Sequence, residues 1–477
     1  MKNKNSIKIV FIISVVLLMG ACTKNFEQIN TNPNQPSVVP LSNHFGGVLL
    51  NFNSAYMQPG GQEPNYVGSR LAAAQNTYSS IGGEWGAYYQ ALKNINKIIK
   101  DAKVAGNTNL QAAAITFRAQ MTQVLTDRFR DLPYSDAIRA EEGDLTPTYD
   151  TQDAIYKAII ADLKAAADLF KTGTGDLGAG DALNGGSVSK WRKYCNSLRL
   201  RVAMRISNVD LATSKNIISE VLGNPTDYPV LGSNTDNVEM IWPGTSPWEN
   251  TFWYWWVLYH HEGAGKLLVD YLNSYNDPRL PIWFIPATTD SKYRGSERVG
   301  FITPNVRNDI SDFNPTFVNG TKGPDSYFRY AEICFLKAEM YQRGITAGDV
   351  KDEYYKGIEA SMLQYRVSTG AIATYKTVKG VALESNANDL NKIYIQKYIS
   401  QFMMDNEAWA EGRRNDVPLF PVASGSLYSG HNRAPFRLPY PQSEQSLNAT
   451  NVATFISNIK DFYWGQQMWW DKRTGVQ

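Results

Sequence analysis

Apolar residues recur at spacings of three and four along several stretches of this chain, which is the period of an amphipathic helix. Residues 111–132 carry one such stripe, from Ala114 to Leu132. Thr151 is the predicted N-cap of a second helix, whose stripe runs from Ile155 to Phe170. A third helix is predicted over residues 191–206. These helices are expected to pack as neighbouring pairs.

The same pattern returns near the other end of the chain. Two stripes over residues 328–341 and 355–365 flank the turn sequence GITAGDV, and a further helix is predicted over residues 393–413. A helix, a short glycine-containing turn and a second helix, with alanines where the two approach, is the logic of tetratricopeptide-type repeats. The irregular spacing predicts degenerate repeats, with helical pairs within about residues 84–207 and 326–414.

Two long regions, at about residues 220–325 and 415–450, lack this period and are rich in Pro, Gly, Asn and Asp. Loops of this length in a compact protein are usually functional or disordered. Their tryptophan and tyrosine content argues against disorder. No Pro/Ser-rich linker or charge block divides the chain, so residues 22–477 are predicted to form a single domain.

The first 21 residues have the pattern of a secretory signal peptide, in which three lysines precede an apolar run that ends in Met-Gly-Ala before Cys22. The run from Ile9 to Met19 is shorter than the roughly 20 apolar residues that span a bilayer. The junction also resembles the lipobox of bacterial lipoproteins, in which the cysteine sulfur is acylated. We therefore predict removal of residues 1–21 and an N-terminal lipid anchor at Cys22, which holds the protein on a membrane without spanning it.

The charge balance excludes a general attraction for polyanions. Residues 1–21 contain three lysines and no acidic residue, so the 47 basic and 45 acidic residues of the chain become 44 and 45 after cleavage. A net charge near −1 gives no attraction for nucleic acid. Beyond Cys22 only Cys195 and Cys334 remain, both at apolar positions of helical patterns, and we interpret them as buried free thiols.

The sequence WPGTSPWENTFWYWWVLYHH at residues 242–261 contains five of the twelve tryptophans. A membrane segment, hydrophobic core and a stacking surface for a ligand with flat apolar faces are the three alternatives. The apolar run from Thr251 to Tyr259 is too short for a membrane span. One helix cannot bury rings that point in several directions, so core and stacking surface both remain open.

The sequence offers no positive sign of an enzyme, and it predicts no catalytic residue, metal site or cofactor. GTGDLG at residues 173–178 follows a helix rather than a strand and is interpreted as a loop, not a dinucleotide fingerprint. His260 and His261 are adjacent, so they cannot face one metal from a helix. A hydrolase remains an alternative, because two catalytic carboxylates need not be close in sequence.

Several segments, in this order, resemble the SusD/RagB family of outer-membrane lipoproteins from Bacteroidetes, in its SusD-like branch. The resemblance covers essentially the whole chain. The segments are NFEQINTNPNQP after Cys22, EWGAYYQALKNIN (84–96), FRAQMTQVLTDRFRDLPYSDA (117–137), PTYDTQDAIYKAIIADLKAA (147–166), WRKYCNSLRLRVAMRIS (191–207), DPRLP (277–281), YAEICFLKAEMYQRG (330–344), QKYISQFMMDNEAWAEGRRNDVPLF (396–420) and RLPYPQSEQSLN (437–448).

The resemblance implies a tetratricopeptide-type helical scaffold packed against an irregular, loop-rich ligand-binding half. It also implies a lipoprotein on the cell surface at the outer membrane. There it would capture a nutrient and deliver it to a SusC-like TonB-dependent β-barrel. Glycans are the usual cargo of the family and peptides the alternative. Charged residues on the 191–207 and 396–420 segments are expected to form ion pairs between helices of the scaffold.

Within that picture the aromatic stretch becomes the first candidate binding site, because sugar rings stack their C–H faces on indole and phenol rings. The predicted ligand-binding residues in it are Trp248, Trp253, Trp255, Trp256 and Tyr259. A second candidate is the segment 61–80, where Asn76 and Tyr78 are the predicted contacts. A third is the loop 293–317, whose asparagines and arginines could bond to ring hydroxyls. Some of the rings are expected to be core and others open.

Overall fold

The computed structural model describes residues 39–56, 64–69, 84–138, 146–246, 248–250, 253, 262–297, 308–318, 323–422, 430–459, 461 and 464–477 of the chain. The chain divides into two compact units, Met1–Leu41 and Ser42–Gln477, and the second contains almost all the described residues. The predicted signal peptide and Cys22 lie outside them. Among the helices that are described, none combines the length and apolar character that crossing a bilayer requires.

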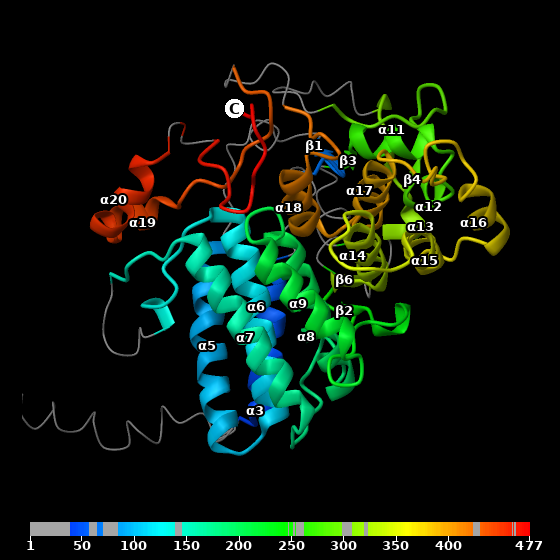
Figure 1. Cartoon of the computed structure of the whole chain (residues 1–477). Coiled ribbons are helices and arrows are strands. Elements are labelled where there is room, and N and C mark those ends of the chain that lie inside the picture. The colour runs from blue at the N-terminus through cyan, green and yellow to red at the C-terminus, as the bar shows by residue number, and fades with distance from the viewer. Residues whose placement is uncertain are drawn as a thin grey trace, which may run out of the picture. The chain divides into compact units, whose positions relative to one another are not determined.

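The first half of the second unit is a row of long helices (Figure 1). They are α3 (Leu41–Tyr56), α5 (Glu84–Val104), α6 (Thr108–Phe129), α7 (Gln152–Lys171), α8 (Val188–Ile206) and α9 (Leu211–Gly223). From α5 onwards each helix packs against the next one along the chain. Helix α6 also contacts α8 and α18, so it is buried on nearly every side. Its buried Thr116 therefore bonds back to the Ala112 carbonyl, 2.8 Å away.

A second helical group follows later in the chain. It consists of α14 (Tyr330–Gln342), α15 (Val350–Gln364), α16 (Thr369–Tyr375), α17 (Asp389–Ser400) and α18 (Asp405–Asn415). Helices α14 and α15 form a closely packed pair around the turn at Gly344, and α17 packs on both. Helix α14 also contacts α8, and α18 contacts α6, so the two helical groups share one interface.

The remaining described residues form short elements and loops. Three two-stranded antiparallel ladders pair β1 (Val67–Ser69) with β3 (Glu262–Ala264), β2 (Val238–Ile241) with β6 (Pro324–Phe328), and β4 (Phe284–Ile285) with β5 (Asp312–Phe313). The other short elements are η2 (Asn234–Asp236), α11 (Lys266–Ser274), α12 (Leu280–Trp283), α13 (Pro315–Val318), α19 (Gln442–Leu447) and α20 (Ala449–Ser457). The mainly α fold, with a tetratricopeptide-type scaffold against a loop-rich half, is thereby confirmed.

Several predicted helix limits were wrong in detail. The helix predicted over 111–132 spans 108–129, and Arg130 ends it with a φ of 73°. Phe328 belongs to β6 rather than to the following helix. Thr151 does occupy the N-cap position of α7, but its hydroxyl donates to Asp153 (2.6 Å) and caps no backbone N–H. The predicted stripe of α7, from Ile155 to Phe170, is buried throughout.

The helix predicted over residues 393–413 is two helices, α17 and α18. The chain turns at Gln401–Met404, where Met403 has a φ of 69°. Arg329 stabilises this break, because its guanidinium donates to the carbonyls of Ser400 and Phe402, each 2.9 Å away. Those carbonyls lie at the end of α17, where no further helical turn can bond to them.

A buried charge cluster joins the two helical groups, as predicted. Its members are Arg201 and Arg205 of α8, Glu332 and Glu339 of α14, Lys397 of α17, and Glu407, Glu411 and Arg414 of α18. Arg201 donates to both oxygens of Glu332, at 2.6 and 2.8 Å. Arg205 donates to Glu407 (2.5 Å). These contacts fix the packing of α8 on α14 and α18.

The electrostatics of the cluster favour the ionised forms of Glu411 on α18 and Glu339 on α14. Burial alone would raise the pKa of Glu411, but Arg414, Lys397 and Arg205 together hold that pKa well below its ordinary value. Burial also opposes ionisation of Glu339, whose pKa is nevertheless lowered, chiefly by Arg414. Both carboxylates therefore carry full charge at neutral pH and need their cationic partners.

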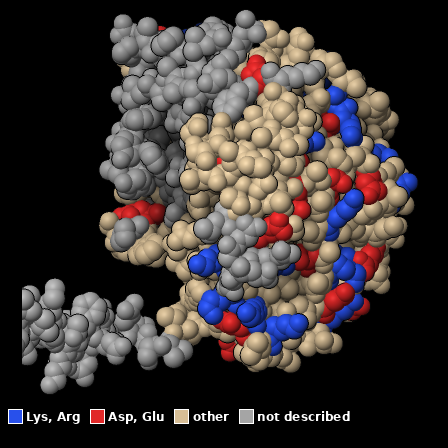
Figure 2. All heavy atoms as spheres, turned by 90° about the vertical axis from the view of Figure 1, so that its left-hand side faces the viewer, with Lys and Arg blue, Asp and Glu red and all other residues tan. Residues whose placement is uncertain are grey.

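The described surface carries both signs of charge side by side. Figure 2 shows lysines and arginines interspersed with acidic residues over the helical face turned to the viewer. Over the described surface as a whole, exposed pairs one helical turn apart bring opposite charges together, as in Lys97 with Asp101 (2.7 Å) and Lys356 with Asp352 (2.5 Å). This face shows no single-sign stripe among its described residues, which agrees with the near-zero net charge.

Candidate ligand-binding site

The described part of the aromatic stretch begins as a loop fixed at its base. Residues 242–250, here named the Trp248 loop, follow directly after β2. Trp242 is 3% exposed, and its indole N–H donates to Asp325 Oδ2 (2.6 Å). Asp325 lies in β6 opposite Met240. Trp242 therefore belongs to the core, where its N–H requires a buried acceptor.

The same Asp325 carboxylate holds the far end of the loop. Asn250 donates to Asp325 Oδ1 (2.8 Å) and to the Gly323 carbonyl (3.1 Å). Asn53 of α3 donates to Asp325 Oδ2 (2.8 Å). Three segments that are distant in the chain thus meet on one carboxylate that is itself only 3% exposed.

Between these two fixed ends the loop turns outward. Trp248 donates its backbone N–H to the Thr245 carbonyl (2.7 Å), and the Gly244 N–H donates to the Trp248 carbonyl (2.9 Å). Gly244 has a φ of 79°, a conformation that favours glycine. The Trp248 side chain is 43% exposed, which is unusual for a large apolar ring. The geometry therefore presents this indole to solvent on an ordered turn.

Trp253 is partly buried, and its backbone N–H donates to Asn250 Oδ1 (2.9 Å). Asn250 therefore links Asp325 to the backbone of Trp253, which is a second predicted site residue. The other predicted contacts, Trp255, Trp256, Tyr259, Asn76 and Tyr78, lie outside the described residues, and their roles stay predictions.

The second and third candidate segments meet at β3, which follows the aromatic stretch in the chain. Strand β1, in the second candidate segment, pairs with β3 in the register Val67 to Ala264. In the third candidate loop, Ser296 donates its N–H to the Ala264 carbonyl (2.7 Å), and Ser311 accepts from the Ala264 N–H (3.1 Å). These two segments were predicted separately from the sequence, and their described parts are joined through β3.

Tyr66, at the start of β1, belongs to the core beneath this junction. Its ring stacks on Tyr398 with a centroid distance of 4.7 Å, and its hydroxyl donates to the Tyr398 carbonyl (2.5 Å). Burial raises the pKa of Tyr66 well above its ordinary value, so the hydroxyl remains a donor at neutral pH. Tyr66 is fully buried and is not a ligand contact.

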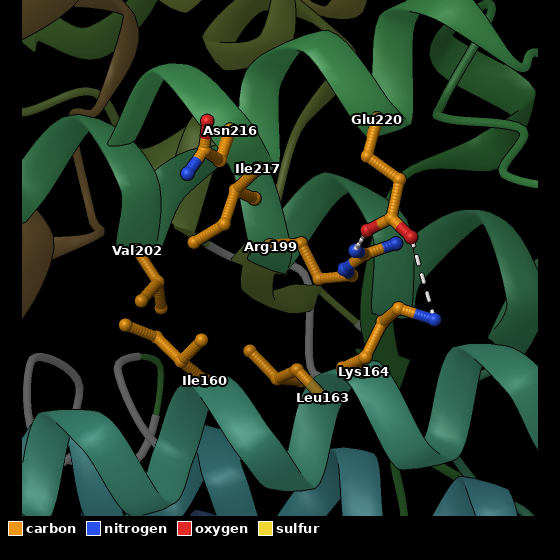
Figure 3. Close-up of a pocket in the computed structure, with 8 residues that line it drawn as sticks. All are labelled: Ile160, Leu163, Lys164, Arg199, Val202, Asn216, Ile217 and Glu220. Atoms are coloured by element: carbon orange, nitrogen blue, oxygen red, sulfur yellow. Dashed lines mark hydrogen bonds and ion pairs between the residues drawn. The ribbon is translucent and has the colours of Figure 1, made fainter. Parts of the chain in front are cut away.

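A separate pocket of about 260 Å³ lies between α7, α8 and α9. Figure 3 shows four aliphatic side chains pointing into it and a charged group at one side. The aliphatic residues are Ile160, Leu163, Val202 and Ile217. At the rim Glu220 pairs with Arg199 and lies 3.3 Å from Lys164. Burial opposes ionisation of Glu220, but Arg199 lowers its pKa, so the rim holds paired charges.

Neither the role of Asp325 nor this pocket was predicted from the sequence. Asp325 sits in a short strand with no motif around it, and only its neighbours in space identify it. The pocket is lined by residues of ordinary helical stripes. No cluster of three or more potential metal-ligating side chains occurs among the described residues.

Comparison with known families identifies the chain. Residues 30–441 match a SusD-like family model described as "Starch-binding associating with outer membrane". The match spans most of the chain, so the protein belongs to the SusD-like family. A search of curated proteins gave no match.

Solved structures agree with this assignment. A chitin-binding protein is 27% identical with a TM-score of 0.78, and the alignment covers 91% of this chain and 99% of that one. A SusD homologue from Bacteroides fragilis is 25% identical with a TM-score of 0.79, covering 92% and 100%. A SusD-like protein from Bacteroides thetaiotaomicron, at 24% identity and a TM-score of 0.79, covers the same shares and shares the fold.

Proposed function

We propose that this protein binds an oligosaccharide at the cell surface and delivers it, unchanged, to a SusC-like TonB-dependent β-barrel. The observation that carries the proposal is the exposed indole of Trp248 on a loop fixed at both ends. A flat apolar ring held in solvent matches the C–H face of a pyranose, and burying it contributes about 25 cal/mol per Å². The family's starch-binding description and the similarity to a chitin-binding protein support a glycan as ligand.

The proposed contacts belong to the aromatic stretch, residues 242–261, and to the segment 61–80. They are Trp248, Trp253, Trp255, Trp256, Tyr259, Asn76 and Tyr78. An open surface of rings suits a protein that must capture a cargo and then release it. It would also accept peptides rich in proline or aromatic residues, so a peptide-import lipoprotein is the alternative that the experiment must separate.

Calorimetric titration of residues 23–477 tests the glycan proposal. We expect binding of α-1,4-linked gluco-oligosaccharides or of N-acetylglucosamine oligosaccharides, and a loss of at least about tenfold in affinity for Trp248→Ala, because a central ring contributes 2 kcal/mol or more at such sites. Leu447→Ala removes another exposed apolar side chain, 78% exposed on α19, and should leave affinity unchanged.

Two results would contradict this proposal. Binding of mixed oligopeptides without any glycan would establish the peptide alternative. Shortening of the bound oligosaccharide during incubation, lost on changing one carboxylate, would establish a hydrolase.

The proposed location follows from the N-terminus. Residues 1–21 would be removed and Cys22 acylated, leaving residues 22–477 tethered to the outer membrane. Cys22→Ser should move the protein from the membrane fraction to the soluble fraction. Wild-type protein should also co-purify with a β-barrel of the TonB-dependent class. Equal membrane retention of the Cys22→Ser variant would contradict the anchor.

A further inference from the structure

We propose that Asp325 is the positioning residue of the glycan site, and that its carboxylate sets ligand affinity by holding the Trp248 loop in its binding conformation. The inference rests on the proposed function of Trp248. Asp325 itself lies buried beneath the loop and acts through Trp242 and Asn250.

Hydrogen bonds to Asp325 hold the two ends of the Trp248 loop. Trp242 is its first residue and Asn250 its last, and both donate to Asp325, one to each carboxylate oxygen. One side chain therefore bonds to both ends of the loop, and the Gly323 carbonyl adds a further bond to Asn250. The described hydrogen bonds inside the loop, between Gly244, Thr245 and Trp248, are local to the turn and do not connect it to the scaffold.

Asn53 connects this closure to the helical scaffold. It donates from α3 to the same oxygen that accepts the Trp242 N–H. The sequence separations between Asp325 and its donors are 272, 83 and 75 residues. The position of the loop is therefore fixed by contacts with α3 and β6, which are distant from it in the chain.

The chemistry requires a carboxylate at this position. The three described partners, Asn53, Trp242 and Asn250, all donate N–H groups, and a carboxylate only accepts, on both oxygens. An amide of the same shape would place its own NH₂ group against at least one of these donors. Hydrogen bonds to an ionised acceptor in a buried setting are also the stronger class. Asp325→Asn therefore keeps the volume of the side chain but loses at least one of the hydrogen bonds that hold the base of the loop.

The consequence for binding is preorganisation. A loop that is already ordered loses little conformational freedom when a ligand settles on its exposed ring, whereas a loose loop must be ordered at that moment. Asn250 extends the same effect to Trp253, whose backbone N–H it accepts. Loosening the base of the loop should therefore weaken binding by about tenfold, without removing any group that touches the ligand.

Asp181 provides a matched control. It is 3% exposed, accepts a tryptophan indole N–H from Trp191 (2.7 Å), and accepts three backbone N–H groups in the connection between α7 and α8. Asp181→Asn is thus the same substitution at an equally buried carboxylate that also accepts from tryptophan, on a different part of the scaffold. It should lower stability and leave glycan affinity unchanged.

The experiment measures affinity and loop order separately. Titration with the glycan that binds wild type should show about a tenfold loss for Asp325→Asn, a smaller loss for Asn250→Ala, and none for Asp181→Asn. In the Trp248→Ala background the Asp325→Asn effect should shrink to the part that acts through Trp253, because the ring that Asp325 chiefly positions is gone. A purely structural role would leave the effect additive.

Fluorine NMR of protein labelled with 5-fluorotryptophan supplies the readout that needs no ligand. The Trp248 signal, assigned from Trp248→Phe, should be single in wild type and in Asp181→Asn, and broadened or split in Asp325→Asn and Asn250→Ala. An unchanged Trp248 signal in Asp325→Asn, or equal affinity losses in the two aspartate variants, would overturn the inference. If wild type binds no glycan, the proposed function fails, while the NMR comparison still decides whether Asp325 orders the loop.

Discussion

Replacing Arg414 with methionine is expected to lower the free energy of unfolding by about 3–5 kcal/mol, the range found when one partner of a buried ion pair is removed. Arg414 is fully buried, donates to both oxygens of Glu339 at 2.7 Å each, and donates to Glu411 at 2.7 Å. Methionine fills much of the space but leaves two ionised carboxylates short of a cation. Urea unfolding of wild type and variant provides the measurement.

Two further variants separate the ion pair from general packing. Arg414→Met combined with Glu339→Met should regain a large part of the loss, because only Glu411 is then short of a cation and it keeps its bond from Lys397. Lys376→Met breaks an exposed pair with Glu359 and should change stability by less than about 1 kcal/mol. A loss below that value for Arg414→Met would show that the cluster does not hold the helical groups together.

Replacing Trp470 with alanine is the second large effect, with an expected loss of about 3–5 kcal/mol in the free energy of unfolding. The ring is fully buried near the C-terminus, and its indole N–H donates to Asp127 of α6 (2.8 Å). The adjacent Trp469 donates its backbone N–H to Gln152 of α7 (2.7 Å). The substitution would open a cavity between the C-terminal segment and the helices and leave Asp127 with one donor fewer.

Two further variants separate the contribution of the buried Trp470 ring from that of an exposed tryptophan. Trp470→Phe keeps one six-membered aromatic ring but removes the five-membered part of the indole with its N–H, so it should lower stability by less than Trp470→Ala does. Trp248→Ala, an exposed tryptophan, should change stability by no more than about 0.5 kcal/mol while abolishing most glycan affinity. The two tryptophans would then show opposite profiles. Equal stability losses for Trp470→Ala and Trp248→Ala would contradict the assignment of Trp470 to the core.

The helices were predictable because their signal is local. The stripe from Ile155 to Phe170 repeats every three to four residues, and any helix with that pattern must bury it. The break at Gln401–Met404 was not predictable, because Arg329, about seventy residues earlier, bonds to the carbonyls there. A continuous apolar pattern across residues 393–413 says nothing of that distant guanidinium.

The candidate site, too, was only partly predictable from the sequence. Clustered tryptophans marked the aromatic stretch, and the structure shows that Trp242 is core while Trp248 is exposed. Which ring would be core depended on Asp325, whose described donors are 75 or more residues away in the chain. Polar residues whose partners are distant in the chain produce no periodic pattern in a sequence. The role of Asp325 beneath the site could therefore be found only from the structure.

The stretch from Asp325 to Glu332 has a consequence for how such a site could change over generations. Asp325 closes the Trp248 loop, Arg329 stabilises the break between α17 and α18, and Glu332 pairs with Arg201 of α8. Three roles thus occupy eight consecutive residues that run from β6 into α14. An insertion or deletion of one residue here would disturb ligand contact and scaffold packing at once. New specificities should therefore arise by substitutions within the loop, at fixed length of this connecting segment.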